Sequence, residues 1–99
     1  MHHVLLYEVA PDFVARRAPY REAHLAYARE AVARGELILG GAWGDPVDGA
    51  ALLFRTDSAE IPAAFAAGDP YVRQGLVVGW TIKPWWTVVG PEAEQPRQN

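Results

Sequence analysis

The chain lacks cysteine, and its only lysine is Lys83. The absence of cysteine excludes disulfides, thiolate nucleophiles and zinc or iron–sulfur sites held by cysteine. The arginines are spread along the chain and the formal net charge is −3. The sequence therefore lacks the clustered positive charge that binds a phosphate backbone, and we expect no nucleic-acid partner.

Long apolar runs and targeting features are also lacking. No stretch approaches the roughly 20 apolar residues of a membrane-spanning helix. The first residues show no basic region followed by an apolar run and a cleavage site. No glycine-rich phosphate loop or nucleotide-binding fingerprint is present. We therefore expect a cytoplasmic protein with no membrane partner.

Apolar material is sufficient for one small domain. The hydrophobic fraction is 51% and the aromatic fraction 11%, which suits a chain of 99 residues with a single core. We predict one domain over residues 1–90. Residues 91–99 are polar and contain two prolines, which is typical of a disordered tail.

Four segments show the alternation and turn boundaries of β-strands. They cover residues 3–9, 36–43, 50–56 and 76–89. The pair Gly40 and Gly41 indicates a bulge in the second strand, or the close approach of another group. Pro84 interrupts the last strand, which therefore belongs at a sheet edge.

Helical spacing appears in two longer segments and two short ones. The predicted helices cover residues 19–35 and 58–68, and single helical turns are expected at residues 12–16 and 70–74. The first helix should begin at Pro19, because proline suits the first helical turn. Ala18 precedes that proline and is therefore biased away from helix.

The resulting order is β-α-β-β-α-β, which is the ferredoxin-like arrangement. This α+β fold has a four-stranded antiparallel sheet with two helices on one face. The other face would stay uncovered, and an apolar sheet face in water is an association surface. We expect Trp80 and one of Trp85 and Trp86 on that face, rather than lining an apolar pocket. We therefore predict a homodimer that packs sheet against sheet.

His24 is the first candidate for chemistry, because it lies on the buried stripe of the first helix. The C-terminal half of this stripe is alanine and valine, whereas the N-terminal half offers Arg21 and His24. Arg17 lies one turn before Arg21 if the helical path extends through Pro19. A change from apolar to polar along one face is typical of a pocket rim. The alternative is a core histidine bonded to a backbone carbonyl, with arginines that reach to water.

Asp69 is the second candidate. Because it precedes Pro70, its simplest interpretation is a helix N-cap followed by proline at the first helical position. A carboxylate also fixes the tautomer of a neighbouring imidazole, which would let His24 act as a general acid or base near neutral pH. The two roles are compatible, since one oxygen can cap while the other meets the imidazole.

The remaining polar clusters give weaker signals. His2 and His3 are adjacent on a strand and point to opposite faces, so they cannot share a metal ion, and we expect both to be solvated. Asp45 and Asp48 flank a turn and are typical turn formers. No spacing offers three or four converging ligands, so no metal site is predicted.

Four fragments in order resemble the YciI-like (DGPF) family. They are residues 21–25 (REAHL), 35–41 (GELILGG), 67–72 (AGDPYV) and 82–85 (IKPW). The match extends over about residues 3–86. The resemblance implies a ferredoxin-like subunit of a dimeric α/β barrel.

The resemblance also implies site residues. In that family a histidine of the first helix and the aspartate of the Asp-Pro-Tyr segment form the proposed active-site pair, which carries over to His24 and Asp69. Arg21 and Arg17 match typical arginines and would hold an anionic substrate. The implied activity is that of a cofactor-independent lyase or isomerase on a small aromatic or lactone-like acid. A non-catalytic small-molecule binder and a purely structural dimer module remain alternatives.

Overall fold

The computed structural model describes residues 1–94. Its elements, in chain order, are β1 (His2–Val9), α1 (Phe13–Arg16), α2 (Ala18–Ala33), β2 (Leu37–Trp43), β3 (Gly49–Arg55), α3 (Glu60–Gly68), α4 (Pro70–Arg73) and β4 (Val77–Trp85). The four strands form an antiparallel sheet in the order β2-β3-β1-β4. The predicted ferredoxin-like α+β fold is confirmed, and both short helical turns are present.

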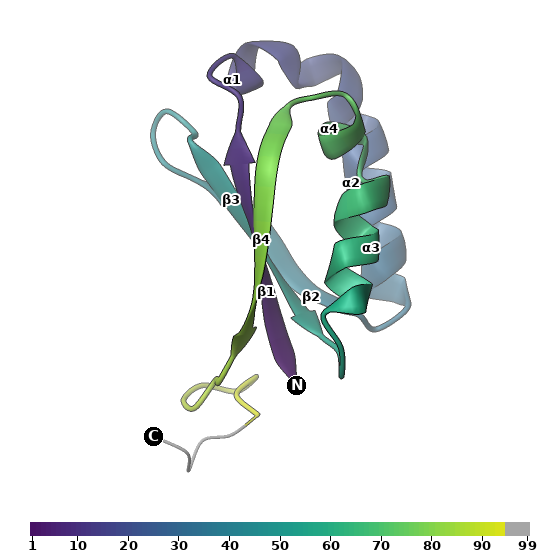
Figure 1. Ribbon diagram of the computed structural model, residues 1–99, viewed down its shortest axis with the longest axis vertical. Helices are drawn as coiled ribbons and strands as arrows, with labels where there is room; N and C mark the ends of the chain where they lie inside the picture. Colours follow the sequence, from purple (N-terminus) through teal and green to yellow (C-terminus); the bar gives the residue numbers. More distant parts are fainter. Residues whose placement is uncertain (95–99) are drawn as a thin grey trace.

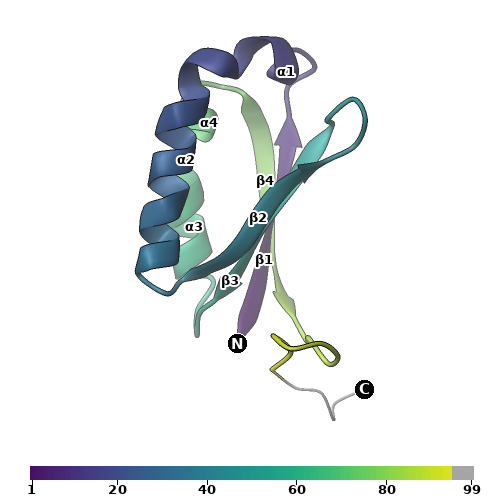
Figure 2. The same cartoon turned by 180° about the vertical axis from the view of Figure 1, so that it is seen from behind.

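Helices cover one face of this sheet. Figure 1 shows α2, α3 and α4 on the same side of the strands, and the reverse view in Figure 2 agrees. Alternation along β1 points Leu5 and Tyr7 toward the helices, where both are buried. Phe54 of β3 lies on the same face and contacts Phe65 of α3, with ring centroids 5.3 Å apart. The core therefore lies between the sheet and the helices.

The opposite face is open over the described residues. We define the open-face patch as the large apolar side chains that the strand register places there. They are Val4, Leu6, Leu39, Trp43, Leu53 and Trp85. Leu39 is 62% exposed, Trp43 48% and Trp85 49%. Apolar residues therefore face solvent on this side of the monomer.

Trp80 differs from its predicted placement. It pairs with Tyr7 in the register, and Tyr7 points toward the helices. Trp80 therefore lies on the helix-covered side, at the edge strand, where it is 40% exposed. Trp85 pairs with His2 on the open face, as expected.

The N-terminal histidines also differ from their expectation, because both are buried. His2 Nδ1 lies 2.6 Å from the Thr87 hydroxyl and 3.7 Å from a Glu94 carboxylate oxygen. His3 Nδ1 lies 3.3 Å from the Thr56 hydroxyl. The expectation of solvated side chains is wrong, because the residues after β4 fold back over His2, and His3 lies on the helix-facing side of the sheet beside Thr56.

The ends of several elements differ from their predicted positions, among them those of α2 and β4. α2 begins at Ala18 rather than Pro19, because α1 already directs the chain into helical geometry and Arg17 itself is αR. Pro19 is tolerated there because an amide at the first turn would have no intrahelical partner. β4 ends at Trp85, so residues 86–89 lie outside the strand. Pro84 lies within β4, which is an edge strand as expected.

The glycine pair of β2 lies next to a register irregularity, which occurs between Leu37 and Leu39. A Cβ at Gly40 would lie 3.2 Å from Cγ of Leu52, so this glycine permits a close approach on the helix side. No helix within residues 1–94 has both the length and the apolar character needed to cross a bilayer. The domain boundary at residue 90 stays a prediction. Within the predicted disordered tail, Glu92 and Glu94 form ion pairs with Arg55, and residues 95–99 lie outside the described residues.

Candidate functional site

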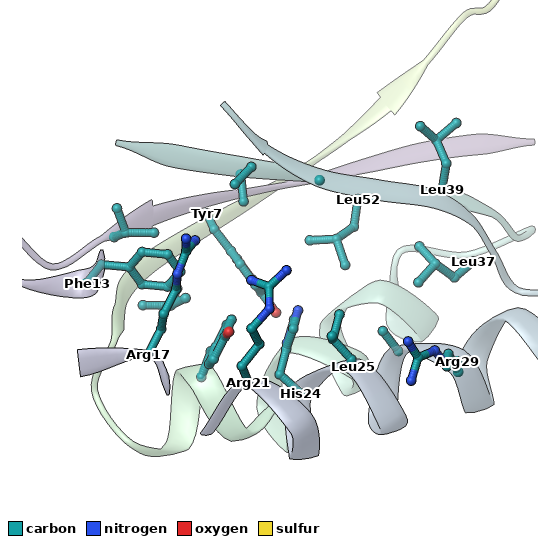
Figure 3. Close-up of a pocket in the computed structure, with 18 of the residues that line it drawn as sticks. Tyr7, Phe13, Arg17, Arg21, His24, Leu25, Arg29, Leu37, Leu39 and Leu52 are labelled. Atoms are coloured by element: carbon teal, nitrogen blue, oxygen red, sulfur yellow. The ribbon is translucent and has the colours of Figure 1, made fainter. Parts of the chain in front are cut away.

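A cavity of about 420 Å³ lies between α2 and the helix-facing side of the sheet (Figure 3). Its apolar wall includes Phe13, Leu25, Leu37, Leu52 and Val77. Its polar wall includes Tyr7, Arg17, Arg21, His24, Arg29 and Tyr71. The residues predicted from the helix stripe therefore meet side chains from the sheet and from α4.

Helical spacing brings the predicted basic residues to one rim. Arg17, Arg21 and His24 follow one another at intervals of four and three residues, which keeps them on one helix face. Figure 3 shows all three rising from the helical side toward the sheet. The helical path through α1 and α2 makes this possible, since Arg17 joins the two helices in αR geometry.

Asp69 is fully buried behind this rim. Its backbone is extended, with φ −65° and ψ 125°, as expected for a residue before proline. Its Oδ1 accepts the backbone N–H of Tyr71 at 3.0 Å, so the predicted cap of α4 is present. The same Oδ1 lies 2.8 Å from Nδ1 of His24. One oxygen thus serves both the cap and the imidazole, where separate oxygens were expected.

The second carboxylate oxygen has a partner that the sequence analysis missed. The Tyr7 hydroxyl donates a hydrogen bond to Asp69 Oδ2 at 2.7 Å. Burial, followed by the negative charge of Asp69 and this hydrogen bond, raises the pKa of Tyr7 far above its usual range. Tyr7 therefore stays a protonated donor. The alternation of β1 could have indicated this contact, because it buries Tyr7 and a buried hydroxyl needs a hydrogen-bond partner.

The His24 ring is held in place from two sides. Its side chain is 16% exposed. Its ring stacks on that of Tyr71 with centroids 4.0 Å apart and an interplanar angle of 8°. Because an ionised carboxylate only accepts hydrogen bonds, Nδ1 donates to Asp69 and Nε2 is the nitrogen left for the cavity. This arrangement is suited to moving a proton.

The arginines of the rim have no acidic partners. Within residues 1–94, neither Arg17 nor Arg21 forms an ion pair with a carboxylate. The Arg17 guanidinium lies over the Phe13 ring, 5.6 Å from its centroid. Figure 3 places Arg29 near Leu37, away from the Phe13 end. Uncompensated guanidinium groups at a cavity rim favour an anionic ligand.

Metal ligands do not gather in this region. In the part of the chain that the structure describes, no group of three or more His, Asp or Glu side chains is placed to hold an ion. The turn residues Asp45 and Asp48 belong to the loop between β2 and β3, outside the cavity wall.

The chain is similar to known proteins over most of its length. The model of the YCII-related domain matches residues 1–86. A solved structure of 5-chloro-2-hydroxyhydroquinone dehydrochlorinase from Burkholderia phenoliruptrix, in complex with 2,5-dihydroxybenzoquinone, is similar with a TM-score of 0.74 and 22% identity. That similarity covers 95% of this chain and 100% of the dehydrochlorinase chain.

A crystal structure of a protein from Agrobacterium tumefaciens is also similar, with a TM-score of 0.52 and 14% identity. The similarity covers 83% of this chain and 88% of that chain. None of the curated proteins matches the chain significantly. At these identities the two structures show a shared fold and no more.

Proposed function

The chain belongs to the YCII-related domain family, and from this premise we propose that it is a cofactor-independent enzyme acting on a small anionic organic molecule. In this proposal His24 and Asp69 form the acid/base pair. The observation that carries it is the 2.8 Å contact between His24 Nδ1 and the fully buried Asp69 Oδ1 at the wall of a cavity. Such a pair leaves Nε2 free to exchange a proton with a bound molecule.

The proposed reaction begins with a proton transfer to His24. Neutral His24 takes a proton from the substrate through Nε2, and the carboxylate of Asp69 stabilises the imidazolium that forms. Return of this proton to another substrate atom gives an isomerisation. Departure of an anionic leaving group instead, with the electron pair of the broken bond, gives an elimination, after which the imidazolium releases the abstracted proton to water. Both outcomes balance without a further reactant.

The cavity favours a small acidic ring as substrate. Its volume of about 420 Å³ and its apolar wall suit such a molecule, and Arg17 and Arg21 offer charge to an anionic oxygen. The dehydrochlorinase of the same fold is named for a hydroxylated chlorinated ring, and its structure contains 2,5-dihydroxybenzoquinone. We therefore propose substrates of this chemical class.

The test is turnover of 5-chloro-2-hydroxyhydroquinone. Chloride release reports elimination, and deuterium uptake from heavy water reports proton exchange. We expect both with the unmodified protein, and neither above background with His24→Ala. Glu22→Gln, an exposed neighbour on α2, serves as the control and should leave turnover unchanged. An inactive wild type, or equal rates in His24→Ala, would contradict the proposal, and binding without turnover would indicate a non-catalytic binder.

We also propose that the open-face patch pairs with a second copy of the chain. Its supporting observation is the exposure of Leu39, Trp43 and Trp85 on one sheet face, which is an association surface. Sheet-against-sheet contact would exclude water from both copies. Sedimentation should show a dimer for the wild type and for Ile61→Arg, which lies on α3, but a monomer for Leu53→Arg. A monomeric wild type at the highest soluble concentration would contradict this proposal.

A further inference from the structure

The hydroxyl of Tyr71 is buried and has no hydrogen-bond partner among the described residues. Tyr71 is 5% exposed and lines the cavity. Its ring is fixed by the stack on His24 and by an edge contact with Phe13, with centroids 5.3 Å apart at 83°. Its backbone N–H is bonded to Asp69. The hydroxyl is therefore held in one place without an acceptor.

An unmade hydrogen bond of this kind is costly, because burial removes the hydroxyl from water and nothing replaces it. The cationic side chains that act on it are Arg17 and Arg21, which are donors only. Burial raises the pKa of Tyr71, while the positive charges of Arg21 and Arg17 partly offset that effect. Arg21 can donate to the phenolic oxygen of Tyr71, but neither arginine can accept the phenolic proton, so that proton has no acceptor among the described residues.

We infer that Tyr71, Arg17 and Arg21 form an anion subsite that receives an acidic oxygen of the substrate. This inference rests on the proposed function, because it assumes that the substrate occupies the cavity. The ligand class is a planar organic acid whose charge lies on an enolate, phenolate or carboxylate oxygen. Because Tyr71 also stacks on His24, the subsite places the anionic oxygen at a fixed position relative to Nε2. Tyr71 is therefore a substrate-binding and specificity residue.

The chemistry of the subsite predicts discrimination between acids and their neutral analogues. Hydrogen bonds to an ionised oxygen are roughly twice as strong as those to a neutral oxygen, so a subsite of one hydroxyl and two guanidinium groups should prefer the anion. Methylation of the acidic hydroxyls of 2,5-dihydroxybenzoquinone keeps the ring but removes its negative charge. The methylated compound, 2,5-dimethoxybenzoquinone, is thus a matched neutral probe.

The experiment is a calorimetric titration of both quinones into the wild type and four variants. The variants are Tyr71→Phe, Arg21→Met, His24→Ala and the control Tyr27→Phe. Tyr27 is a suitable control because its hydroxyl donates to the Phe65 carbonyl and it does not line the cavity. We expect Tyr71→Phe and Arg21→Met each to weaken binding of 2,5-dihydroxybenzoquinone by about 10- to 100-fold. Their binding of the dimethoxy compound should stay at the wild-type level.

Several outcomes would overturn the inference. These are no binding of 2,5-dihydroxybenzoquinone to the wild type, unchanged affinity in Tyr71→Phe, and an equal loss for both quinones, which would indicate altered packing. If Tyr71→Phe fails to fold, the exposed Arg21→Met gives the same selective test. His24→Ala separates the two proposals, because it should keep the preference for the acidic quinone. A wild type that binds the acidic quinone preferentially but shows no turnover would support the subsite and contradict the proposed enzymatic activity.

Discussion

The hydroxyl of Tyr7 donates to Oδ2 of Asp69, the carboxylate oxygen that His24 leaves free. The two residues are 62 positions apart and come from β1 and the start of α4. Both oxygens of the buried carboxylate are thereby engaged, which fixes its plane and, through it, the His24 ring. Tyr7 is therefore a positioning residue that acts on the chemistry through Asp69.

Replacement of Tyr7 by Phe tests this role. The change leaves Oδ2 buried without its donor, so we expect the free energy of unfolding to fall by about 1–3 kcal/mol. We also expect kcat for chloride release to fall roughly tenfold or more, as when a group that orients a functional side chain is removed. Affinity for 2,5-dihydroxybenzoquinone should change little. Urea unfolding, kinetics and titration measure the three quantities, with Tyr20→Phe as the control, and an unaltered kcat would contradict the positioning role.

The same contact predicts a pH dependence of stability. Burial, then the charge and hydrogen bond of Asp69, raises the pKa of Tyr7 above its ordinary value of 10.0. Above that value the unfolded chain loses the phenolic proton while the native state keeps it. The native state then binds more protons, so the contribution of Tyr7 is complete below pH 10 and is lost as pH rises.

Above the pKa of Tyr7 in the unfolded chain, this single group should lower the free energy of unfolding by about 1.4 kcal/mol per pH unit. Urea unfolding of wild type and Tyr7→Phe between about pH 9 and 11 measures it, since the other tyrosines contribute equally to both proteins. The variant should show a shallower decline. If the free energy of unfolding declined equally with pH in the two proteins, the pKa of Tyr7 would not be raised by its surroundings.

The sequence was most informative where local pattern decides the outcome. Strand alternation and turn residues predicted the order of the elements along the chain, and the stripe of α2 predicted that Arg21 and His24 line a rim. Asp69 was predicted as a cap from its position before Pro70. Its contact with His24, 45 residues away, depends on how α4 packs against α2, which no local pattern encodes.

The missed residues depend on contacts between distant elements. Tyr7 was recognisable as buried, but the partner of its hydroxyl follows from the placement of the junction between α3 and α4 beside β1. The burial of His2 results from Thr87 and Glu94, which return to the N-terminus after β4. The side on which Trp80 lies follows from its register with β1, and period-2 alternation alone cannot assign a face to a strand.

Asp69→Asn tests whether the charge of the carboxylate matters as well as its shape. An amide offers one acceptor oxygen and one NH2 donor, whereas the site presents three donors to Asp69. The neutral amide also cannot stabilise the imidazolium that forms when His24 takes a proton. We expect kcat to fall by about three orders of magnitude or more, and stability by about 1–3 kcal/mol.

Affinity for 2,5-dihydroxybenzoquinone should persist in Asp69→Asn, because the anion subsite does not include this residue. Stopped-flow chloride release and calorimetry separate the two effects. Asp57→Asn, on an exposed residue before α3, is the control for the substitution itself. Near-normal turnover in Asp69→Asn would mean that Asp69 serves only as the cap of α4.

Gly68→Ala tests the contact that positions Asp69 along the chain. Gly68 ends α3 directly before Asp69, and a Cβ there would collide with the hydroxyl of Tyr27. That hydroxyl is held by its 2.8 Å bond to the Phe65 carbonyl. Helix propensity alone favours alanine by about 1 kcal/mol. The collision should outweigh it, with a net loss of about 1–3 kcal/mol in unfolding free energy.

A double-mutant cycle with Tyr27→Phe isolates this collision, because removal of the hydroxyl frees the space that the methyl group needs. The double variant should therefore be more stable than the sum of the two single changes predicts. Gly41→Ala is the control for adding a methyl group, since a Cβ at that position has no atom within 4 Å. Strict additivity, or a Gly68→Ala protein as stable as the wild type, would show that Tyr27 moves aside freely and does not fix the end of α3.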